Sequence, residues 1–274
     1  MAQILESLSV EILAEKIGLP SNALLELSTD APLLYFKKLI PKNGSSTRKL
    51  EIPYLILKNF QKKLLKKILH KIPSHHKLYG SPGTSIKKAV AEHVRKATVI
   101  TMDIKDFFPS IKVFKVKNTF IRNGATIGVA EILSRLVTHK NHLPQGAPTS
   151  PCIGRLVLQQ FADEFEKLLE KIPKSSFSIY VDDITISGPE KIKGIQNTVG
   201  KMLNRHGFEI NKNKTKIMNR DEEQVSLNIK LNKRIEATER YLKEIEELEK
   251  RVPSSDPVLR GKKSYVKYLM RPDY

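Results

Sequence analysis

The chain has 274 residues, of which 40% are hydrophobic, so it can bury a substantial core and is too apolar for wholesale disorder. Its 48 Lys and Arg against 29 Asp and Glu give a net charge of +19. Solvated helix faces explain many of the lysines but not the shortage of acids. A surplus of this size attracts polyanions, most often nucleic acid. An anionic membrane surface is the weaker alternative, because no strongly hydrophobic amphipathic segment accompanies the charge.

Several classes of protein are excluded at this stage. No apolar stretch approaches the roughly 20 residues that cross a bilayer, and the first residues carry acids and lack the basic leader of a secretory signal. Cys152 is the single cysteine, which excludes disulfides and cysteine-based zinc sites and predicts a cytoplasmic location. The seven histidines are scattered, so we expect oxygen atoms to hold any metal ion.

The first half of the chain predicts helices around an extended hairpin and one buried strand. The expected elements are one or two short helices within 1–30, extended runs at 34–41 and 48–53 around Asn43-Gly44, a helix at 54–72, a strand at 99–102, and helices within 113–138 that break at Asn123-Gly124.

The second half predicts further strands and amphipathic helices. Apolar residues every four positions from Ile153 to Leu169 predict a long buried helix, and strands are expected at 177–181 and 184–186. A helix through Ile192 and Met202, closed by Gly207, follows. The charged stretch 233–252 is expected to form a helix with ion pairs such as Glu239 with Lys243. Mixed strands and helices in this order predict an α+β fold.

Three segments contain the residues expected to carry the chemistry. Asp103 ends the apolar strand, Leu143–Pro151 is a proline-rich loop, and Asp182-Asp183 lies between two strands. Phosphoryl transfer needs divalent ions that bridge the attacking and leaving oxygens. Since Mg²⁺ is commonly bound by a few carboxylates with water and phosphate oxygens, two or three aspartates that converge would suffice.

Each segment alone has a simpler interpretation. Asp103 is also consistent with the cap of a helix that begins near Pro109, and Asp182-Asp183 with an exposed hairpin turn. The proline-rich loop is also consistent with a rigid entry into a helix. The order and combination of the three segments favour the catalytic interpretation.

Together the segments resemble the active-site motifs of reverse transcriptases: an aspartate strand, a Pro-Gln-Gly loop and Tyr-x-Asp-Asp. The form of Leu143–Pro151 resembles bacterial retron reverse transcriptases in particular. The resemblance implies a right-hand polymerase fold with fingers, a palm built on an antiparallel sheet, and a helical thumb. The expected boundaries are 1–98 for the N-terminal helices and fingers, 99–222 for the palm, with fingers elements between its motifs, and 223–274 for the thumb.

The resemblance also assigns the metal ligands. Asp103 and Asp182 would be the principal ligands of two Mg²⁺ ions, with Asp183 a weaker ligand and the backbone carbonyl of Ile104 completing the coordination shell. These ions would lower the pKa of the primer hydroxyl and stabilise the charge on the reacting phosphorus.

Nucleotide contacts are assigned in the same way, and several keep an alternative. Arg48 would bind the triphosphate, with Lys42 assisting unless it is an ordinary hairpin lysine. Phe108 matches a steric gate against a 2′-hydroxyl, or it is a core aromatic beside Phe107. Gln145 and Gly146 would lie against the nascent base pair, although Gly146 also fits a simple turn. Lys214 would protonate the pyrophosphate leaving group, or it is a surface lysine.

Template and primer would be held by phosphate contacts. The expected cations are Lys58 and Lys62 on a basic helix, and Arg251, Arg260, Lys262 and Lys263 in the thumb. Two departures from the retron pattern lie outside these sites. The family's Asn-Ala-x-x-His element is reduced here to His93, which we expect to be an ordinary helix residue, and its Val-Thr-Gly element is replaced by Val225-Ser226-Leu227.

The resemblance therefore predicts an RNA-directed DNA polymerase (a nucleotidyltransferase). It would copy a cognate structured non-coding RNA into a branched RNA–DNA hybrid (msDNA) and act with an effector protein in antiphage defence. The alternatives are another defence-associated bacterial reverse transcriptase that makes free or protein-primed DNA, and an inactive RNA-binding scaffold with the same fold. No ribonuclease H-like stretch is recognised, so any removal of the template would need a host enzyme.

Overall fold

The computed structural model describes residues 5, 6, 8–41 and 47–271 of the chain. They form two compact units. The first unit contains the residues up to Pro82 together with Lys105–Ala162, and the second contains Gly83–Ile104 and the residues from Asp163 onward. Helix α9 (Gln159–Glu170) passes from one unit into the other. No helix in the described ranges has the length and apolar character needed to cross a membrane.

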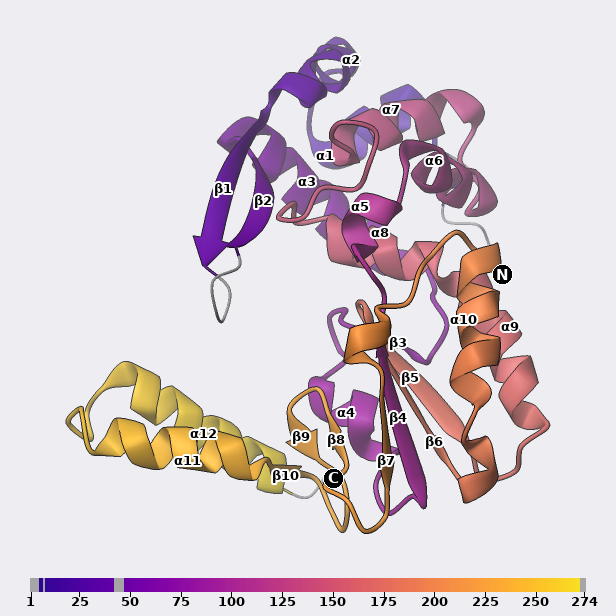
Figure 1. The fold of residues 1–274 in the computed structure, drawn as a ribbon. Coiled ribbons are helices and arrows are strands. Elements are labelled where there is room, and N and C mark those ends of the chain that lie inside the picture. The colour runs from indigo at the N-terminus through magenta and orange to yellow at the C-terminus, as the bar shows by residue number, and fades with distance from the viewer. Residues whose placement is uncertain (1–4, 7, 42–46, 272–274) are drawn as a thin grey trace. The chain divides into compact units, whose positions relative to one another are not determined.

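The first unit is mainly helical, with one two-stranded hairpin (Figure 1). Its elements are α1 (Val10–Ile17), α2 (Ser21–Asp30), the 3-10 turns η1 (Ala31–Leu33) and η2 (Leu69–Lys71), β1 (Tyr35–Pro41), β2 (Thr47–Pro53), α3 (Leu55–Lys67), β3 (Leu78–Tyr79), α5 (Phe107–Ser110), α6 (Val113–Arg122), α7 (Ile127–Val137) and α8 (Ser150–Val157).

The hairpin of β1 and β2 has the antiparallel pairing expected from the sequence. Tyr35 lies opposite Pro53 and Pro41 lies opposite Thr47. Most of β1 is exposed, whereas the C-terminal end of β2 is buried. The predicted Asn43-Gly44 connection and Lys42 lie outside the described residues.

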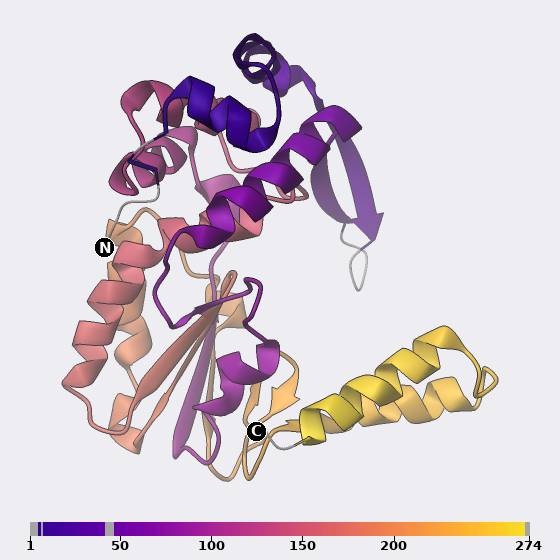
Figure 2. The same ribbon diagram turned by 180° about the vertical axis from the view of Figure 1, so that it is seen from behind.

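The second unit is built on an antiparallel sheet. Its strands β5 (Ser176–Tyr180), β6 (Asp183–Gly188), β4 (Thr98–Asp103) and β7 (Lys216–Asn219) lie side by side in that order. Helix α9 packs on one face, where the rings of Phe165 and Phe177 lie 4.4 Å apart. Helix α4 (Ile86–Ala91) is on the opposite face, as Figure 2 shows from behind. The sheet is therefore covered on both sides, which explains its apolar strands.

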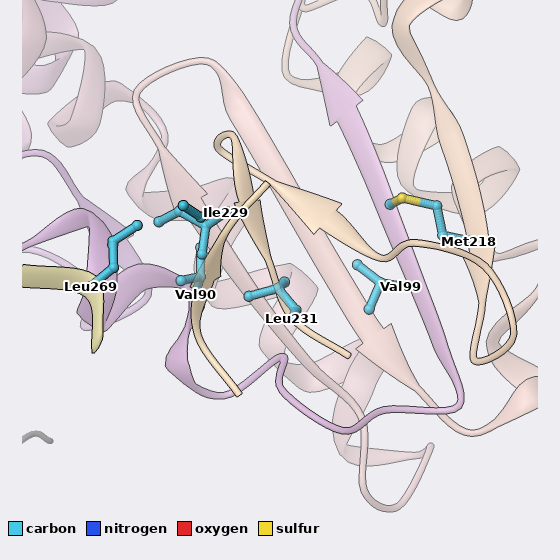
Figure 3. Close-up of a cluster of buried hydrophobic side chains, with 7 residues drawn as sticks. Val90, Val99, Met218, Ile229, Leu231 and Leu269 are labelled. Carbon is cyan, nitrogen blue, oxygen red and sulfur yellow. The ribbon is translucent and has the colours of Figure 1, made fainter. Parts of the chain in front are cut away.

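The remaining elements of the second unit follow the sheet in the chain. They are η3 (Glu190–Ile192), α10 (Ile195–Arg205), η4 (Lys212–Lys214), β8 (Val225–Ser226), β9 (Ile229–Lys230), β10 (Glu236–Ala237), α11 (Glu239–Glu249) and α12 (Pro257–Met270). A buried apolar cluster joins β9, β10 and α12 to strands β4 and β7 of the sheet (Figure 3). Its members are Val90, Val99, Met218, Ile229, Leu231, Ala237 and Leu269.

The helix predicted at 233–252 is wrong in its first part. Glu236 and Ala237 form β10, which pairs with β9, and the helix begins only at Glu239. There the side chain of Thr238 accepts a hydrogen bond from the Tyr241 N–H, as an N-cap does. Strand pairing thus overrides the helical pattern of the preceding residues. The structure pairs Glu239 with Lys230, and Arg240 with Glu244 four residues along the helix.

Two other predicted helices are shorter than expected. The long helix predicted after Pro148 is divided into α8 and α9 at Leu158. The Leu158 N–H still donates a hydrogen bond to the Gly154 carbonyl. Ile192 lies in the separate turn η3, because Gly194 adopts a left-handed φ of 94° before α10 begins. The break at Asn123-Gly124 and the strands flanking Asp182-Asp183 are confirmed.

Candidate active site

The strand register of the second unit brings the three predicted aspartates together. Asp103, the last residue of β4, lies directly opposite Asp183, the first residue of β6. The Ile104 N–H donates a hydrogen bond to the Asp182 carbonyl at 3.0 Å. Since residues opposite each other in an antiparallel pair project from the same face with Cβ atoms about 5 Å apart, the carboxylates of Asp103 and Asp183 are neighbours. Asp103 therefore does not cap a helix; the residue at the N-terminus of α5 is Asp106.

The turn that carries Asp182 has an unusual backbone. Tyr180 pairs with Asp183, which leaves Val181 and Asp182 as a two-residue connection between β5 and β6. Val181 has a φ of 61°, a left-handed conformation that a β-branched residue rarely adopts. Strain of this kind costs about 1–3 kcal/mol and persists where the surrounding structure enforces it. The pairing of β5 with β6 provides that constraint.

The acidic cluster perturbs its own titration. Burial, followed by the charges of Asp182 and Asp103, raises the pKa of Asp183 from 3.8 to about 6, and only Lys214 opposes this rise. The three carboxylates are thus near enough for their charges to interact. An oxygen donor set of this kind suits a hard divalent cation.

Lys214 contributes a positive charge that contacts this cluster. Its Nζ donates to Oδ2 of Asp103 at 2.6 Å. The turn η4 holds it there, and the N–H of Asn211, at the start of that turn, bonds the Asp103 carbonyl at 2.8 Å. The Lys214 side chain is half exposed whereas that of Asp103 is 12% exposed, so the ammonium can move outward while the carboxylate stays in place. Lys214 is therefore part of the site and not an unconnected surface lysine.

The other residues predicted to contact the nucleotide, apart from Lys214, lie in the first unit. Arg48 is exposed on β2, Phe107 is buried, and Phe108 is only partly buried. The ring of Phe107 occupies the space where a Cβ on Gly154 would lie, at 2.8 Å from its Cε1. Phe107 is thus the core aromatic of the pair, which leaves Phe108 available for the predicted gate.

Gln145 and Gly146 are fixed against β2. The Gln145 carbonyl accepts a hydrogen bond from the Glu51 N–H at 2.8 Å. Gly146 has a φ of 127°, and a Cβ there would lie 3.0 Å from the Glu51 carbonyl oxygen. The glycine is therefore required both by its backbone conformation and by close approach to the hairpin.

The predicted cations that would hold template and primer differ in their surroundings. Lys62, Arg251 and Arg260 are exposed, and Lys58 is partly buried. Within the thumb, Lys262 pairs with Glu244 at 3.0 Å and Lys263 pairs with Glu249. These two ion pairs bind α12 to α11, so both lysines also have a structural role.

A buried network next to Gln145 was not predicted from the sequence. The Glu51 carboxylate lies 2.7 Å from Nε2 of His142 and 3.1 Å from Nδ1 of His139, and the Tyr35 ring stacks on His139 at 4.6 Å. Burial lowers the pKa of His139, although Glu51 opposes this effect. The one available signal was a His-x-x-His pair around Lys140-Asn141, which fits a tight two-residue turn.

His93 was predicted to be an ordinary helix residue, and this is wrong. It follows α4 and is fully buried, with Nδ1 2.7 Å from the Ser187 hydroxyl and Nε2 2.9 Å from the Ser178 hydroxyl. Ser178 lies on β5 and Ser187 on β6. The imidazole therefore joins the two strands that present Asp182 and Asp183.

Comparison with known sequences agrees with this geometry. A sequence model of the family described as reverse transcriptase (RNA-dependent DNA polymerase) matches residues 40–269. The chain belongs to the reverse transcriptase family. Enzymes of this family generally use divalent metal ions, in accord with the acidic cluster.

The relatives of this reverse transcriptase include retron proteins. The retron Mx65 reverse transcriptase of Myxococcus xanthus is 30% identical over 207 residues, which cover 68% of this chain and 48% of that protein. The retron Se72 reverse transcriptase of Salmonella heidelberg is 31% identical over 222 residues, which cover 76% of this chain and 57% of the relative. The predicted resemblance to bacterial retron-type enzymes is confirmed. The chain spans about half the length of these curated relatives.

Solved structures show the same fold in more distant proteins. Telomerase from Candida albicans, in complex with a TWJ fragment of telomeric RNA, superposes with a TM-score of 0.54 at 13% identity. The superposition covers 78% of this chain and 50% of the telomerase chain. At this identity the likeness concerns the fold alone, and it confirms the predicted α+β polymerase fold.

Proposed function

We propose that this reverse transcriptase catalyses RNA-templated DNA synthesis at the cluster of Asp103, Asp182 and Asp183. The observation that carries the proposal is the register that pairs Asp103 with Asp183 and bonds Ile104 to Asp182. Two strands from different parts of the chain thereby bring the three aspartates to the same end of the sheet. In the proposed reaction the primer hydroxyl attacks the α-phosphorus of a deoxynucleoside triphosphate, a phosphodiester bond forms, and pyrophosphate leaves.

The residues present fit a pair of Mg²⁺ ions. Burial, followed by the charges of Asp182 and Asp103, raises the pKa of Asp183, and a bound cation would stabilise these carboxylates in their ionised form. Asp103 and Asp182 would be the principal ligands and Asp183 a weaker one, with the backbone of Ile104 beside them. Bound Mg²⁺ would supply activation of the primer hydroxyl and stabilisation of charge on the phosphate oxygens.

The other residues would bind and orient the nucleotide. Lys214 would transfer its hydrogen bond from Asp103 to the departing pyrophosphate and donate a proton there. Arg48 would bind the triphosphate through its guanidinium. Phe108, which is not needed in the core, would exclude a 2′-hydroxyl. Gln145 and Gly146 would contact the nascent base pair. The fingers, palm and thumb boundaries at 98/99 and 222/223 remain part of this proposal.

We further propose that the protein is a retron reverse transcriptase. Sequence similarity to retron reverse transcriptases supports it. The chain would copy a cognate structured RNA in the cytoplasm, prime from a 2′-hydroxyl of that RNA, and keep the branched product (msDNA) bound. An effector protein for antiphage defence would complete the system.

The catalytic proposal is tested by the Asp182→Asn/Asp183→Asn double variant. We expect no deoxynucleotide incorporation on a primed RNA template and RNA binding close to that of the unaltered protein. The matched control is Asp221→Asn, which removes an exposed carboxylate after β7 and should retain synthesis. Synthesis at the unaltered rate in the double variant would refute the assignment of the site.

The retron proposal needs a separate measurement. The protein is purified from its native host and the bound nucleic acid is extracted and sequenced. DNA joined to an internal 2′-hydroxyl of RNA is the expected product. DNA attached to a Tyr or Ser hydroxyl of the protein, or free DNA, would assign the chain to another group of reverse transcriptases. Bound RNA without any DNA would favour an inactive scaffold.

A further inference from the structure

The hairpin of β1 and β2 carries positive charge on both of its faces. In the antiparallel register Lys37 lies opposite Glu51, and Leu39 lies opposite Lys49. Because side chains alternate between the two faces of a strand, Lys37, Leu39, Lys49 and Glu51 share one face. Arg48, the residue proposed to bind the triphosphate, belongs to the other. The face of Lys37 and Lys49 is therefore not the proposed nucleotide face.

A third lysine reaches this face from a tight turn. His139 and His142 exchange backbone hydrogen bonds of 2.8 and 3.0 Å, which leaves Lys140 and Asn141 as a two-residue connection. Their φ angles are 47° and 65°. Such turns favour Gly, Asn or Asp at both central positions, so a lysine at the first one is conformationally unfavourable. A residue held in an unfavourable backbone conformation is a reason to look for function at that point.

The buried network fixes this turn beside the hairpin. The Glu51 carboxylate contacts both imidazoles that flank the turn, His142 at 2.7 Å and His139 at 3.1 Å. Glu51 is also the residue opposite Lys37 in the sheet register. Glu51, which faces Lys37 across the hairpin, thus contacts the two histidines. The same contacts bring the turn that carries Lys140 close to Lys37.

The three lysines are exposed and crowd one another. The charge of Lys140, followed by that of Lys49, lowers the pKa of the Lys37 ammonium, in accord with the placement of the three lysines by the strand register and the turn. Ammonium groups that converge in this way repel one another unless an anion lies between them. Leu39, on the same face, has 64% of its surface exposed.

We propose that Lys37, Lys49 and Lys140 form a second anion site, which binds the phosphate backbone of single-stranded nucleic acid. Lysines on an open strand face act as point charges for successive phosphates, with no glycine-rich cradle to enclose a compact polyphosphate. The exposed side chain of Leu39 offers apolar surface to a base, which only an unpaired base can reach. This binding does not depend on the proposed catalytic step.

The test measures binding of a short unstructured RNA to the full chain by fluorescence anisotropy over a range of salt concentrations. Each lost phosphate contact on a single strand lowers the magnitude of the slope of log K against log salt by about 0.7. For the Lys37→Gln/Lys49→Gln/Lys140→Asn variant we therefore expect a slope about 2 lower than that of the unaltered protein. A variant with equal charge loss elsewhere, Lys117→Gln/Lys171→Gln/Lys191→Gln, should keep its slope nearly unchanged.

The single variant Lys140→Asn separates binding from folding. Asparagine tolerates the left-handed backbone, so the melting temperature of the Lys140→Asn variant should be higher than that of the unaltered protein. The affinity of the variant for RNA should be lower because one positive charge is lost. A lower melting temperature together with the lower affinity would count against the proposal. An unchanged salt slope in the triple variant would overturn it.

Two further measurements separate nucleic acid from free polyphosphate as the ligand, and binding from the proposed catalysis. Inorganic tripolyphosphate, added at matched ionic strength, should displace little RNA from the unaltered protein. Strong displacement that depends on the three lysines would assign the site to a free polyphosphate and overturn the proposal. All binding is repeated in the Asp182→Asn/Asp183→Asn background. Binding that depends on the lysines in this background supports the inference even if the proposed polymerisation fails.

Discussion

Neutralising one member of the acidic cluster should stabilise the metal-free protein. The pKa of Asp183 rises from 3.8 to about 6 because of burial and of the charges of Asp182 and Asp103. Each tenfold change in proton affinity corresponds to about 1.4 kcal/mol, so the unscreened penalty for ionising Asp183 is about 3 kcal/mol. Although neighbouring groups surround the Asp183 carboxyl, the residue keeps exposed surface at the start of β6, so solvent screens part of this penalty. We therefore expect Asp183→Asn to raise the free energy of unfolding by about 1–2 kcal/mol at neutral pH.

The pH dependence of this effect checks its cause. A carboxyl with a raised pKa in the folded state destabilises the fold above about pH 6, where it is ionised, and has no such effect below its unfolded pKa of 3.8. Denaturant unfolding of both proteins in chelator, from pH 7 down to pH 4, should show the advantage of Asp183→Asn shrinking. Added Mg²⁺ should stabilise the unaltered protein more than the variant. An advantage independent of pH, or a loss of stability at pH 7, would refute the electrostatic explanation.

Three other substitutions test separate contacts. Lys214→Gln removes the ammonium that bonds Asp103, so calorimetry should show tighter Mg²⁺ binding, while single-turnover DNA synthesis slows; weaker Mg²⁺ binding would contradict the ion pair. Gly146→Ala should cost about 1–3 kcal/mol in thermal unfolding because of its φ of 127° and the close Glu51 carbonyl. Its control Gly200→Ala, in a helix with nothing within 4 Å, should gain about 0.5–1 kcal/mol. His93→Ala should lose about 2–4 kcal/mol by leaving a cavity and two buried hydroxyls without their partner; a loss below about 1 kcal/mol would show that the imidazole does not join the strands.

Local patterns predicted the elements that carry the acidic cluster. The apolar run before Asp103 and the alternation on both sides of Asp182-Asp183 are properties of short segments, and both became strands of the sheet. Their convergence followed from the resemblance to a known arrangement of motifs. The strand register places Asp103 opposite Asp183, while the metal site itself stays a prediction.

Features that depend on distant pairing were missed. Glu51 and His142 are separated by 91 positions in the sequence, and nothing near either residue indicates that they meet. Glu236 and Ala237 have a helical pattern but pair with β9. His93 required two serines from strands that follow it by more than 80 positions. Tertiary contacts of this kind override local propensity and cannot be read from a single segment.

The left-handed backbone of Val181 has a consequence for how the enzyme would operate. The hydrogen bonds of β5 and β6 hold the turn in this shape, and its conformational cost lowers the free energy of unfolding. A turn free to relax would leave Asp182 in several positions, and fixing its carboxylate would then add to the activation barrier of the proposed nucleotide addition. A rigid, distorted support for Asp182 keeps the carboxylate in place from one cycle to the next.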